Sequence, residues 1–306
     1  MRILVLGGTR FIGRTIVDTL LPEHEVSVLN RGTQPLWDER ITQLTADRGV
    51  PAQVAAALTA DYDAIVDVSA IDPDHVSAVI DALAGRPAVP YVFIGSSAVY
   101  DRSAVAPPFS EDDPADGDLY WGSYSTDKAA CERLLRAAFG DLLTVLRPPY
   151  VYGPLNTEQR EQFLWARMLA GQPIYVPGDG GTAIQFNHVR ALADIVEAAC
   201  TGAMPTGVYN VGEPRAYTFS EYLHILGQVA GVTPRVEFVR DETVPSRAYF
   251  PFRDIEVTLQ VDRIERTGAQ PAIALPAGLA ETFRWFSEFR GFPDEPTEQE
   301  LAWRKS

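Results

Sequence analysis

The stretch Arg2-Ile-Leu-Val-Leu-Gly-Gly-Thr-Arg-Phe-Ile-Gly13 decides the fold of this chain. Its first five residues form a short apolar run typical of a buried strand, and the segment from Thr15 has the apolar spacing of a helix. The glycines mark a tight turn from strand to helix, where backbone amides and the positive end of the helix can hold a pyrophosphate. A turn that binds no ligand is the alternative. The residues of this turn that we predict to contact a dinucleotide are Gly7, Thr9, Arg10, Phe11, Ile12 and Gly13.

Continuous apolar runs alternate with helical patterns through the first half of the chain. Because such runs are typical of strands buried on both faces, we expect a doubly wound α/β fold with a parallel sheet. The expected strands are 2–6, 25–29, 41–45, 64–68, 91–94 and 142–146, and the expected helices include about 51–58, about 73–84 and the one that carries Tyr124.

The alternation is less regular in the second half, which we interpret as a smaller α/β substrate lobe. We expect residues 1–155 to form the dinucleotide-binding domain, 156–290 to form mainly the lobe with some segments returning to the sheet, and 291–306 to be a loose tail. The expected helices lie at about 158–170, 190–201, 218–230 and 276–289, and the expected strands near 174–176, 183–187, 208–211 and 235–239.

Composition excludes several classes of protein. A formal net charge of −15 disfavours binding to nucleic acid or to anionic membranes, because those partners need a positive surface. Cys131 and Cys200 each fall in a helical pattern, which argues against a disulfide, and no cluster of Cys and His suggests a metal site. The first strand begins at residue 2 and no apolar run reaches the length of a membrane span. We therefore expect a cytoplasmic protein with no metal, no nucleic-acid partner and no membrane partner.

The motif Tyr124-Ser-Thr-Asp-Lys128 carries the predicted chemistry. Lys128 is one of two lysines in the chain, the other being Lys305. A spacing of four residues places Tyr124 and Lys128 on one face of a helix. An ammonium beside a phenol lowers the pKa of the tyrosine, so that the phenol can exchange a proton as a hydride leaves or arrives. A surface pair on an amphipathic helix is the alternative that this motif alone leaves open.

The end of the second expected strand bears on the choice of dinucleotide. Folds that bind NAD usually have an acidic residue there for the adenosine ribose, whereas this chain has Asn30 and Arg31. A guanidinium suits the 2′-phosphate of NADP, and Arg10 in the glycine turn is a second candidate for that contact. We therefore predict that NADP is favoured, with NAD as the alternative.

Several motifs, in order along the chain, resemble those of the extended short-chain dehydrogenase/reductase superfamily, the NAD-dependent epimerase/dehydratase group, whose dinucleotide domain has the Rossmann fold. The resemblance covers nearly the whole chain. The glycine turn is also similar to that of chloroplast stem-loop-binding proteins, atypical members of the group that are associated with RNA. The motifs are the glycine turn, Ala46-Asp47-Arg48, Val99-Tyr100, Tyr124 to Lys128, the run from Leu146 to Pro154, Phe186-Asn-His-Val189 and Tyr209-Asn-Val-Gly212.

The resemblance implies roles for particular residues. Ser96, three residues before Val99, would polarise the substrate oxygen, and Ser97 is the alternative if the loop carries a one-residue slip. Lys128 would hold the ribose hydroxyls of the cofactor while Tyr124 exchanges the proton. Homodimerisation through the helix of Tyr124 and its neighbour is also implied. The other implied cofactor contacts are Asp47 and Arg48 beside the adenine, Val68, Ser69 and Ala70 along the dinucleotide, and Pro149, Tyr150 and Val151 near the nicotinamide.

Departures from the family pattern narrow the reaction. Sugar 4,6-dehydratases of this superfamily place Asp-Glu directly after the active Ser or Thr, whereas Ser97 and Ala98 follow Ser96 here, so removal of water is disfavoured. The nucleotide-sugar epimerases carry an arginine for the diphosphate where this chain has Ile184. Arg253 is a candidate substitute, and an ion pair with a neighbouring acid is its alternative role. The residues that we predict to contact substrate are Ser97, Tyr120, Gln185 and Arg253.

These observations predict an NAD(P)-dependent oxidoreductase or epimerase of the extended short-chain dehydrogenase type. It would transfer a hydride at a secondary alcohol or ketone of a sugar-like or other polar small molecule. Two alternatives stay open: a nucleotide-sugar 4-epimerase that retains NAD tightly, and a non-catalytic member of the family that binds RNA or another partner.

Overall fold

The computed structural model describes residues 1–269, 273–292 and 295–303. The chain divides into two compact units, each described by itself below. Unit 1 comprises Met1–Val151, Asn187–Gly212 and Leu259–Ala272, and unit 2 comprises Tyr152–Phe186, Glu213–Thr258 and Ile273–Ser306. Two segments from the second half of the chain therefore belong to the same unit as the glycine turn.

Unit 1 contains a parallel sheet of seven strands flanked by helices on both faces, which confirms the predicted fold class. The strand order is β10-β6-β5-β4-β1-β2-β3, and every neighbouring pair is parallel. The strands are β1 (Arg2–Leu6), β2 (Glu25–Asn30), β3 (Thr42–Thr45), β4 (Ala64–Asp67), β5 (Tyr91–Ile94), β6 (Leu143–Arg147) and β10 (Gly207–Asn210).

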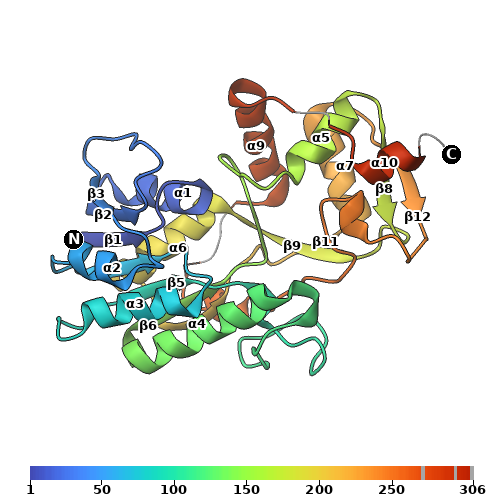
Figure 1. The fold of residues 1–306 in the computed structure, drawn as a ribbon. Coiled ribbons are helices and arrows are strands. Elements are labelled where there is room, and N and C mark those ends of the chain that lie inside the picture. Colours follow the sequence, from blue (N-terminus) through green and yellow to red (C-terminus); the bar gives the residue numbers. More distant parts are fainter. Residues whose placement is uncertain (270–272, 293–294, 304–306) are drawn as a thin grey trace. The chain divides into compact units, whose positions relative to one another are not determined.

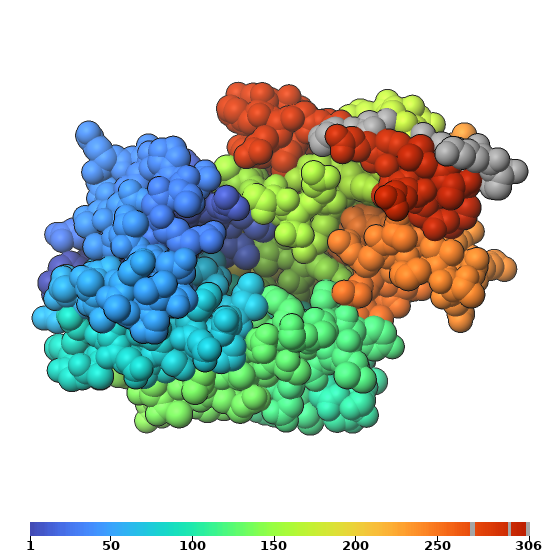
Figure 2. Space-filling view, in the orientation of Figure 1, coloured from blue at the N-terminus to red at the C-terminus, as the bar shows by residue number. Residues whose placement is uncertain are grey.

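The helices of unit 1 cover the two faces of this sheet in separate groups (Figure 1). One face carries α1 (Phe11–Leu20) and α6 (Val189–Thr201), which pack on each other, and the other carries α2 (Pro51–Ala57), α3 (Pro73–Leu83) and α4 (Ser123–Phe139). The central strands are buried throughout because both of their faces meet apolar helix surfaces. Figure 2 shows the amino-terminal segments of unit 1, blue to cyan, at the surface of the molecule.

The parallel arrangement places the carboxyl ends of all seven strands at one edge of the sheet. The glycine turn follows β1, Asn30 ends β2, and Ser69 follows β4. Ser96 follows β5 after a single glycine. Residues that lie far apart in the sequence are thereby brought to one edge, where ligands bind in open α/β sheets.

Unit 2 is built from helices that pack together and from short strands. Helix α7 packs against both α5 and α9, and β12 pairs with β8 in parallel. Strands β7 (Tyr150–Tyr152) and β9 (Ala183–His188) run across the boundaries between the units, and β11 pairs with β9 in antiparallel orientation. The remaining elements are α5 (Glu161–Leu169), β8 (Pro173–Pro177), β11 (Ala216–Thr218), α7 (Phe219–Ala230), β12 (Arg235–Val239) and α9 (Leu275–Phe289).

The end of the chain differs from the loose tail that we expected from its sequence. Residues Glu298–Trp303 form a helix, α10. Its Glu300 accepts two hydrogen bonds, of 2.7 and 2.6 Å, from the Arg167 guanidinium of α5, and both side chains are 1% exposed. The Trp303 ring also packs on Tyr175 and Tyr249. A buried ion pair and aromatic contacts therefore order a segment whose local sequence is polar.

Several short elements were not expected from the sequence. They include β7, β11, a four-residue helix α8 (Asp262–Glu265), and 3-10 turns at Ser97–Val99, Leu119–Trp121, Gly140–Leu142 and Ser246–Ala248. The turn at Gly140–Leu142 moves the start of β6 to Leu143. Among the described residues, none of the helices combines the length and the apolarity needed to cross a lipid bilayer.

Candidate cofactor and catalytic site

The glycine turn is packed too closely for larger residues. Gly7 has a φ of +93°, and a Cβ there would lie 2.4 Å from the Cβ of Ser69. A Cβ on Gly13 would lie 2.1 Å from the backbone oxygen of Gly7. Phe11 begins α1 with a φ of 36°, which is a strained conformation for a bulky residue. The close packing of this turn against Ser69 and against its own backbone therefore requires glycine at both positions.

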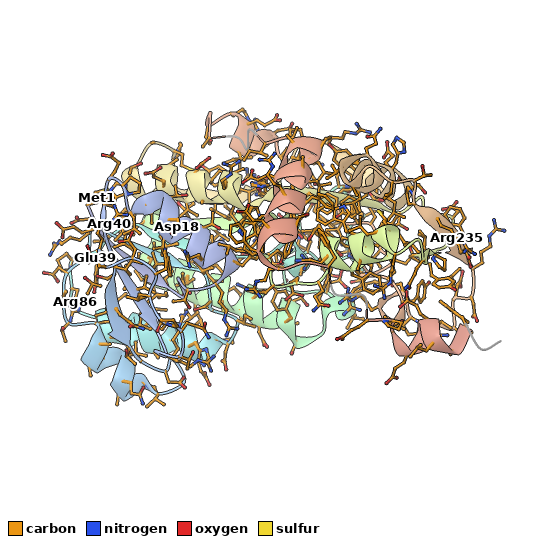
Figure 3. All side chains as sticks on the ribbon, turned by 90° about the horizontal axis from the view of Figure 1, so that it is seen from above. Met1, Asp18, Glu39, Arg40, Arg86 and Arg235 are labelled. Atoms are coloured by element: carbon orange, nitrogen blue, oxygen red, sulfur yellow. The ribbon has the colours of Figure 1, made fainter. Side chains whose placement is uncertain are left out.

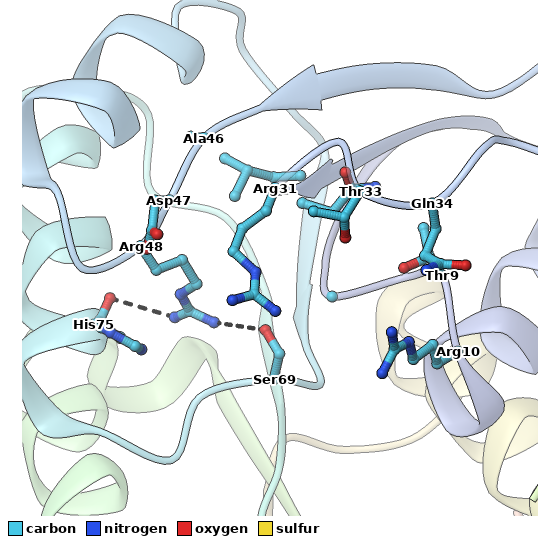
Figure 4. Close-up of a pocket in the computed structure, with 13 residues that line it drawn as sticks. Thr9, Arg10, Arg31, Thr33, Gln34, Ala46, Asp47, Arg48, Ser69 and His75 are labelled. Carbon is cyan, nitrogen blue, oxygen red and sulfur yellow. Dashed lines mark hydrogen bonds between the residues drawn. The ribbon is translucent and has the colours of Figure 1, made fainter. Parts of the chain in front are cut away.

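A pocket of about 440 Å³ opens beside this turn in unit 1 (Figure 4). It brings together many of the residues that the sequence predicts for a dinucleotide, from the glycine turn, the end of β2 and the segments after β3 and β4. Leu29, Thr33, Gln34, Ala46 and His75 also line it and were missed. The predicted residues in the lining are Gly7, Thr9, Arg10, Asn30, Arg31, Asp47, Arg48 and Ser69.

Three arginines line the pocket, but they differ in whether their charge is paired with a carboxylate of the protein. Arg48 is 8% exposed, and its guanidinium donates two hydrogen bonds of 2.7 Å to the buried carboxylate of Asp67. By contrast, Arg10 and Arg31 are exposed, and Figure 4 shows both guanidinium groups directed into the pocket. Neither side chain has a hydrogen bond or an ion pair among the described residues. The pocket thus presents two cations available to an anionic ligand, and a third that is neutralised by Asp67.

Asn30 also fits a ligand at this position. Its Oδ1 accepts hydrogen bonds from the Gly32 amide at 2.6 Å and from Gln43 at 3.0 Å. Its Nδ2 is buried and has no hydrogen-bond partner among the described residues. An orphaned donor of this kind is rare in folded proteins and is satisfied when a ligand supplies an acceptor. With the bare glycine turn and the two available arginines, it makes the pocket suited to a phosphorylated nucleotide.

The predicted catalytic pair lies on the first turns of α4. Tyr124 is 36% exposed, whereas Lys128, one turn later, is only 4% exposed. Lys128 Nζ donates a hydrogen bond of 2.7 Å to the carbonyl oxygen of Ile94 and lies 4.6 Å from the centre of the Phe93 ring. Burial lowers the pKa of Lys128 to about 8, and attraction to Asp67 offsets part of this effect. The lysine is therefore held against the end of β5, next to the serines.

The two candidate serines differ in accessibility. Ser96 is half-buried, and its Oγ accepts a hydrogen bond of 3.2 Å from the Ala98 amide at the start of a 3-10 turn. Ser97 is 7% exposed, and its backbone amide donates to the carbonyl oxygen of Pro148. A substrate can reach Ser96 more readily than Ser97, which favours the former.

Other predicted contacts have surroundings that bear on their roles. Phe11, Ile12, Val68 and Val151 pack against the apolar core of unit 1, and Tyr150 is 8% exposed. Pro149 lies between β6 and β7. Tyr120 is 55% exposed in the 3-10 turn before α4. These assignments stay predictions, because the pocket lining includes none of these residues.

Two predicted substrate contacts, Gln185 and Arg253, belong to unit 2. Gln185 is 1% exposed, and its Nε2 donates to the carbonyl oxygen of Glu213 at 2.5 Å. Its amide is thus already used in the structure. Ser97 and Tyr120 belong to unit 1 with the catalytic pair. Within the described part of the chain, no group of three or more His, Cys, Asp or Glu side chains is placed to hold a metal ion.

Comparisons with known proteins identify the family and the fold. A sequence model described as the NAD dependent epimerase/dehydratase family matches residues 3–212. The chloroplast stem-loop binding protein of 41 kDa b from Arabidopsis thaliana is 27% identical over 92% of this chain and 78% of its own length. A dTDP-glucose 4,6-dehydratase from Streptomyces griseus is 26% identical over 95% of both chains. The crystal structure of dTDP-glucose 4,6-dehydratase from Bacillus anthracis in complex with NAD aligns with a TM-score of 0.79 at 19% identity, covering 95% of this chain and 97% of that one.

Proposed function

Because the chain belongs to the NAD dependent epimerase/dehydratase family, we propose that it is an enzyme that transfers a hydride between a nicotinamide cofactor and a secondary alcohol or ketone. The substrate would be a sugar-like or other polar small molecule. The observation that carries the proposal is the position of Lys128, one turn after the exposed Tyr124 and hydrogen-bonded to Ile94, two residues before Ser96. Lys128 is thus held at the carboxyl end of β5, close in sequence to Ser96, and the proposal places the Tyr124 phenol beside them.

We propose NADP as the cofactor, on the following grounds. Arg10 and Arg31 supply two positive charges, and Asn30 stands where a carboxylate would repel a 2′-phosphate. A phosphate accepts charge-assisted hydrogen bonds from guanidinium groups, and these are stronger than bonds between neutral groups. NAD is the alternative, because Asp47 also lines the pocket.

Each residue of the proposed site would have one task. The nicotinamide would supply or accept the hydride. The Ser96 hydroxyl would donate a hydrogen bond to the substrate oxygen and so stabilise the charge that develops on it. The Tyr124 phenol would give a proton to that oxygen during reduction and take it back during oxidation. The Lys128 ammonium would favour the phenolate that remains after the proton has left.

The sequence around Ser96 bears on the net reaction. Ser97 and Ala98 lack the acid and base groups that removal of water needs, so we do not propose a dehydratase. Reduction and epimerisation use the same three residues and differ in whether the cofactor is released or regenerated. A nucleotide-sugar 4-epimerase that retains NAD is therefore the second candidate. An RNA-binding role is the third, since one relative is named for stem-loop binding, but a net charge of −15 disfavours it.

The proposal also includes a location and an assembly. Both cysteines are buried and free, as in a reducing compartment, so we place the enzyme in the cytoplasm. We propose a homodimer through α4 and its neighbour α3, which sedimentation equilibrium would test. A monomer at all concentrations would refute the dimer and leave the catalytic proposal unaffected.

Cofactor titration and one substitution test the catalytic proposal. Calorimetry should show binding of NADP+, and a panel of carbonyl compounds and nucleotide sugars should reveal turnover through nicotinamide fluorescence. Tyr124→Phe should abolish turnover and leave the Kd of the cofactor nearly unchanged. Tyr62→Phe is the matched control in unit 1 and should keep full activity. Wild-type rates in Tyr124→Phe would refute the site, and RNA bound in place of any dinucleotide would favour the third candidate.

A further inference from the structure

The loop between β2 and β3 forms one wall of the nucleotide pocket. Residues 31–41 have no regular secondary structure, yet Arg31, Thr33 and Gln34 all line the pocket. A loop of this length is ordered only if its side chains are anchored elsewhere. The Gly32 amide donates a hydrogen bond to Asn30 Oδ1 beside Arg31, and the rest of the loop is held by contacts made further along it.

Trp37 supplies the main anchor. Its Nε1 donates a hydrogen bond of 2.6 Å to Oδ1 of Asp18 on α1. The Arg14 guanidinium stacks on the Trp37 ring at 3.7 Å from its centre, and Arg14 Nε also donates to Oδ2 of Asp18 at 3.1 Å. The three side chains thus close a cycle in which each contacts the other two. We call Trp37, Arg14 and Asp18 the loop clamp.

The clamp joins the loop to helix α1, which follows the glycine turn and its pocket residue Arg10. Arg14 and Asp18 come four and eight residues after Arg10, so they continue along the same side of α1. Trp37 and its neighbour Leu36 also pack against the apolar core of unit 1. In the view from above, Asp18 and the loop residue Arg40 lie in the same part of unit 1 (Figure 3). The contacts of Trp37 therefore tie the loop that carries Arg31 to the helix that follows Arg10.

We propose that the loop clamp is a set of positioning residues that determines the preference of this site for a nucleotide bearing a 2′-phosphate. The inference rests on the proposed cofactor, and it adds residues that touch no ligand themselves. A phosphate held by two guanidinium groups needs both in place at once, whereas a ribose without that phosphate does not. When the clamp is lost, the loop populates other conformations. The apparent affinity for the 2′-phosphorylated nucleotide is then the intrinsic affinity multiplied by the fraction of time that Arg31 is correctly placed.

Two nucleotide fragments isolate this effect from catalysis. Adenosine 2′,5′-bisphosphate and adenosine 5′-monophosphate differ only in the 2′-phosphate, and the ratio of their Kd values by calorimetry measures the preference. Asp18→Ala, on an exposed helix side, should weaken binding of the bisphosphate by roughly tenfold and that of the monophosphate by less than about threefold. Trp37→Ala should weaken binding of the bisphosphate by at least as much. Trp37→Phe keeps an aromatic ring but loses the hydrogen-bond donor, so its affinity for the bisphosphate should lie between those of Trp37→Ala and wild type.

Arg40→Ala is the matched control. Arg40 belongs to the same loop, but its ion pair joins Asp38, two residues away, and so does not link the loop to α1. The ratio of the two Kd values in Arg40→Ala should equal that of wild type. An unchanged ratio in Asp18→Ala and Trp37→Ala, in a wild-type protein that prefers the bisphosphate, would overturn the clamp and leave the proposed cofactor standing. A wild type that binds both fragments equally would overturn the NADP preference and the clamp together.

Discussion

The ammonium of Lys128 donates a hydrogen bond to the backbone carbonyl of Ile94, and the two atoms are 2.7 Å apart. This contact ties helix α4 to the last residue of β5, from which the chain passes directly to Gly95 and Ser96. A change in the protonation of Lys128 therefore acts on a residue that is fixed beside the proposed active serine.

Turnover in the direction of reduction should fall as the pH rises through about 8. Burial lowers the pKa of Lys128 to about that value, so the ammonium is present below it and lost above it. The charge supports the Tyr124 phenolate that forms on proton transfer, so its loss should slow this step. A pH profile of kcat checks this. In Lys128→Arg, which keeps its charge at alkaline pH, the decrease in kcat should occur at a higher pH. A decrease at the same pH as in wild type would exclude Lys128 as its cause.

Lys128→Met should lose activity but gain stability at neutral pH. The unfolded chain keeps the lysine proton up to about pH 10.4, whereas the folded chain releases it near 8. Between these values the unfolded state binds more protons, so the stability of the wild-type protein rises with pH there. Removal of the buried charge should stabilise the folded state, and loss of the hydrogen bond to the Ile94 carbonyl should cost about 1 kcal/mol. Urea unfolding at pH 7 should therefore show a net gain of roughly 2 kcal/mol in the free energy of unfolding of Lys128→Met. The gain should shrink as the pH approaches 10.4, and a constant gain would contradict this account.

Ser96→Ala should reduce kcat by about 10² to 10³, the usual effect of removing one donor to a developing oxyanion. The accessible hydroxyl of Ser96 favours it over Ser97, whose side chain is buried. Ser97→Ala is the matched control and should change kcat only slightly. Steady-state kinetics with saturating cofactor would measure both, and a larger loss in Ser97→Ala would transfer the role to that residue.

Arg48→Met should destabilise unit 1 by about 3 to 5 kcal/mol, because it leaves the Asp67 carboxylate buried without its cation. Asp67 is fully buried and also accepts hydrogen bonds from Tyr91 and from the Ser69 and Ala70 amides. Urea denaturation measures the change. Arg2→Met is the control, because the Arg2–Asp63 pair is exposed and should contribute little. Equal midpoints for the two variants would contradict the structural role of Arg48.

Glu300→Gln should destabilise unit 2 and remove part of its acid sensitivity. Burial alone would raise the pKa of Glu300, but the Arg167 guanidinium and the Thr297 amide outweigh it and lower the pKa. The stabilisation is therefore present above the unfolded value of about 4.3 and is lost as the pH falls through the folded value. Thermal unfolding from pH 7 downward would show a smaller pH dependence in Glu300→Gln. Glu237→Gln, from the exposed pair with Arg235, is the control and should match wild type.

The sheet of unit 1 was predictable because its signal is local. Runs such as Ile3 to Leu6 are continuously apolar, and a glycine turn at one end leaves few alternatives. Helix α10 was not predictable, because its segment becomes ordered through Arg167, more than a hundred residues earlier in the chain. Sequence patterns report which face of an element is apolar, but they do not report a distant ionic partner.

In the candidate site too, residues with a local sequence signal were predictable, and those that depend on distant contacts were not. Arg10 and Arg31 were singled out by their places after β1 and β2, and Arg48 by the family resemblance, but the sequence gives no sign that Asp67 neutralises Arg48. His75 lines the pocket from the first turn of α3, where a lone histidine has no distinguishing pattern. Thr33 and Gln34 lie in a loop that Trp37 joins to α1 through Asp18. Residues that depend on loop conformation therefore needed the structure.

The scarcity of lysine makes the proposed catalytic centre easy to observe by magnetic resonance. Because Lys128 and Lys305 are the only two lysines in the sequence, protein grown with isotope-labelled lysine would give two side-chain signals, without chemical modification. The signal of Lys128, whose ammonium lies over the Phe93 ring, should be displaced in frequency by the ring current. Its titration could then be followed in the intact protein, with and without dinucleotide, before any substrate is known.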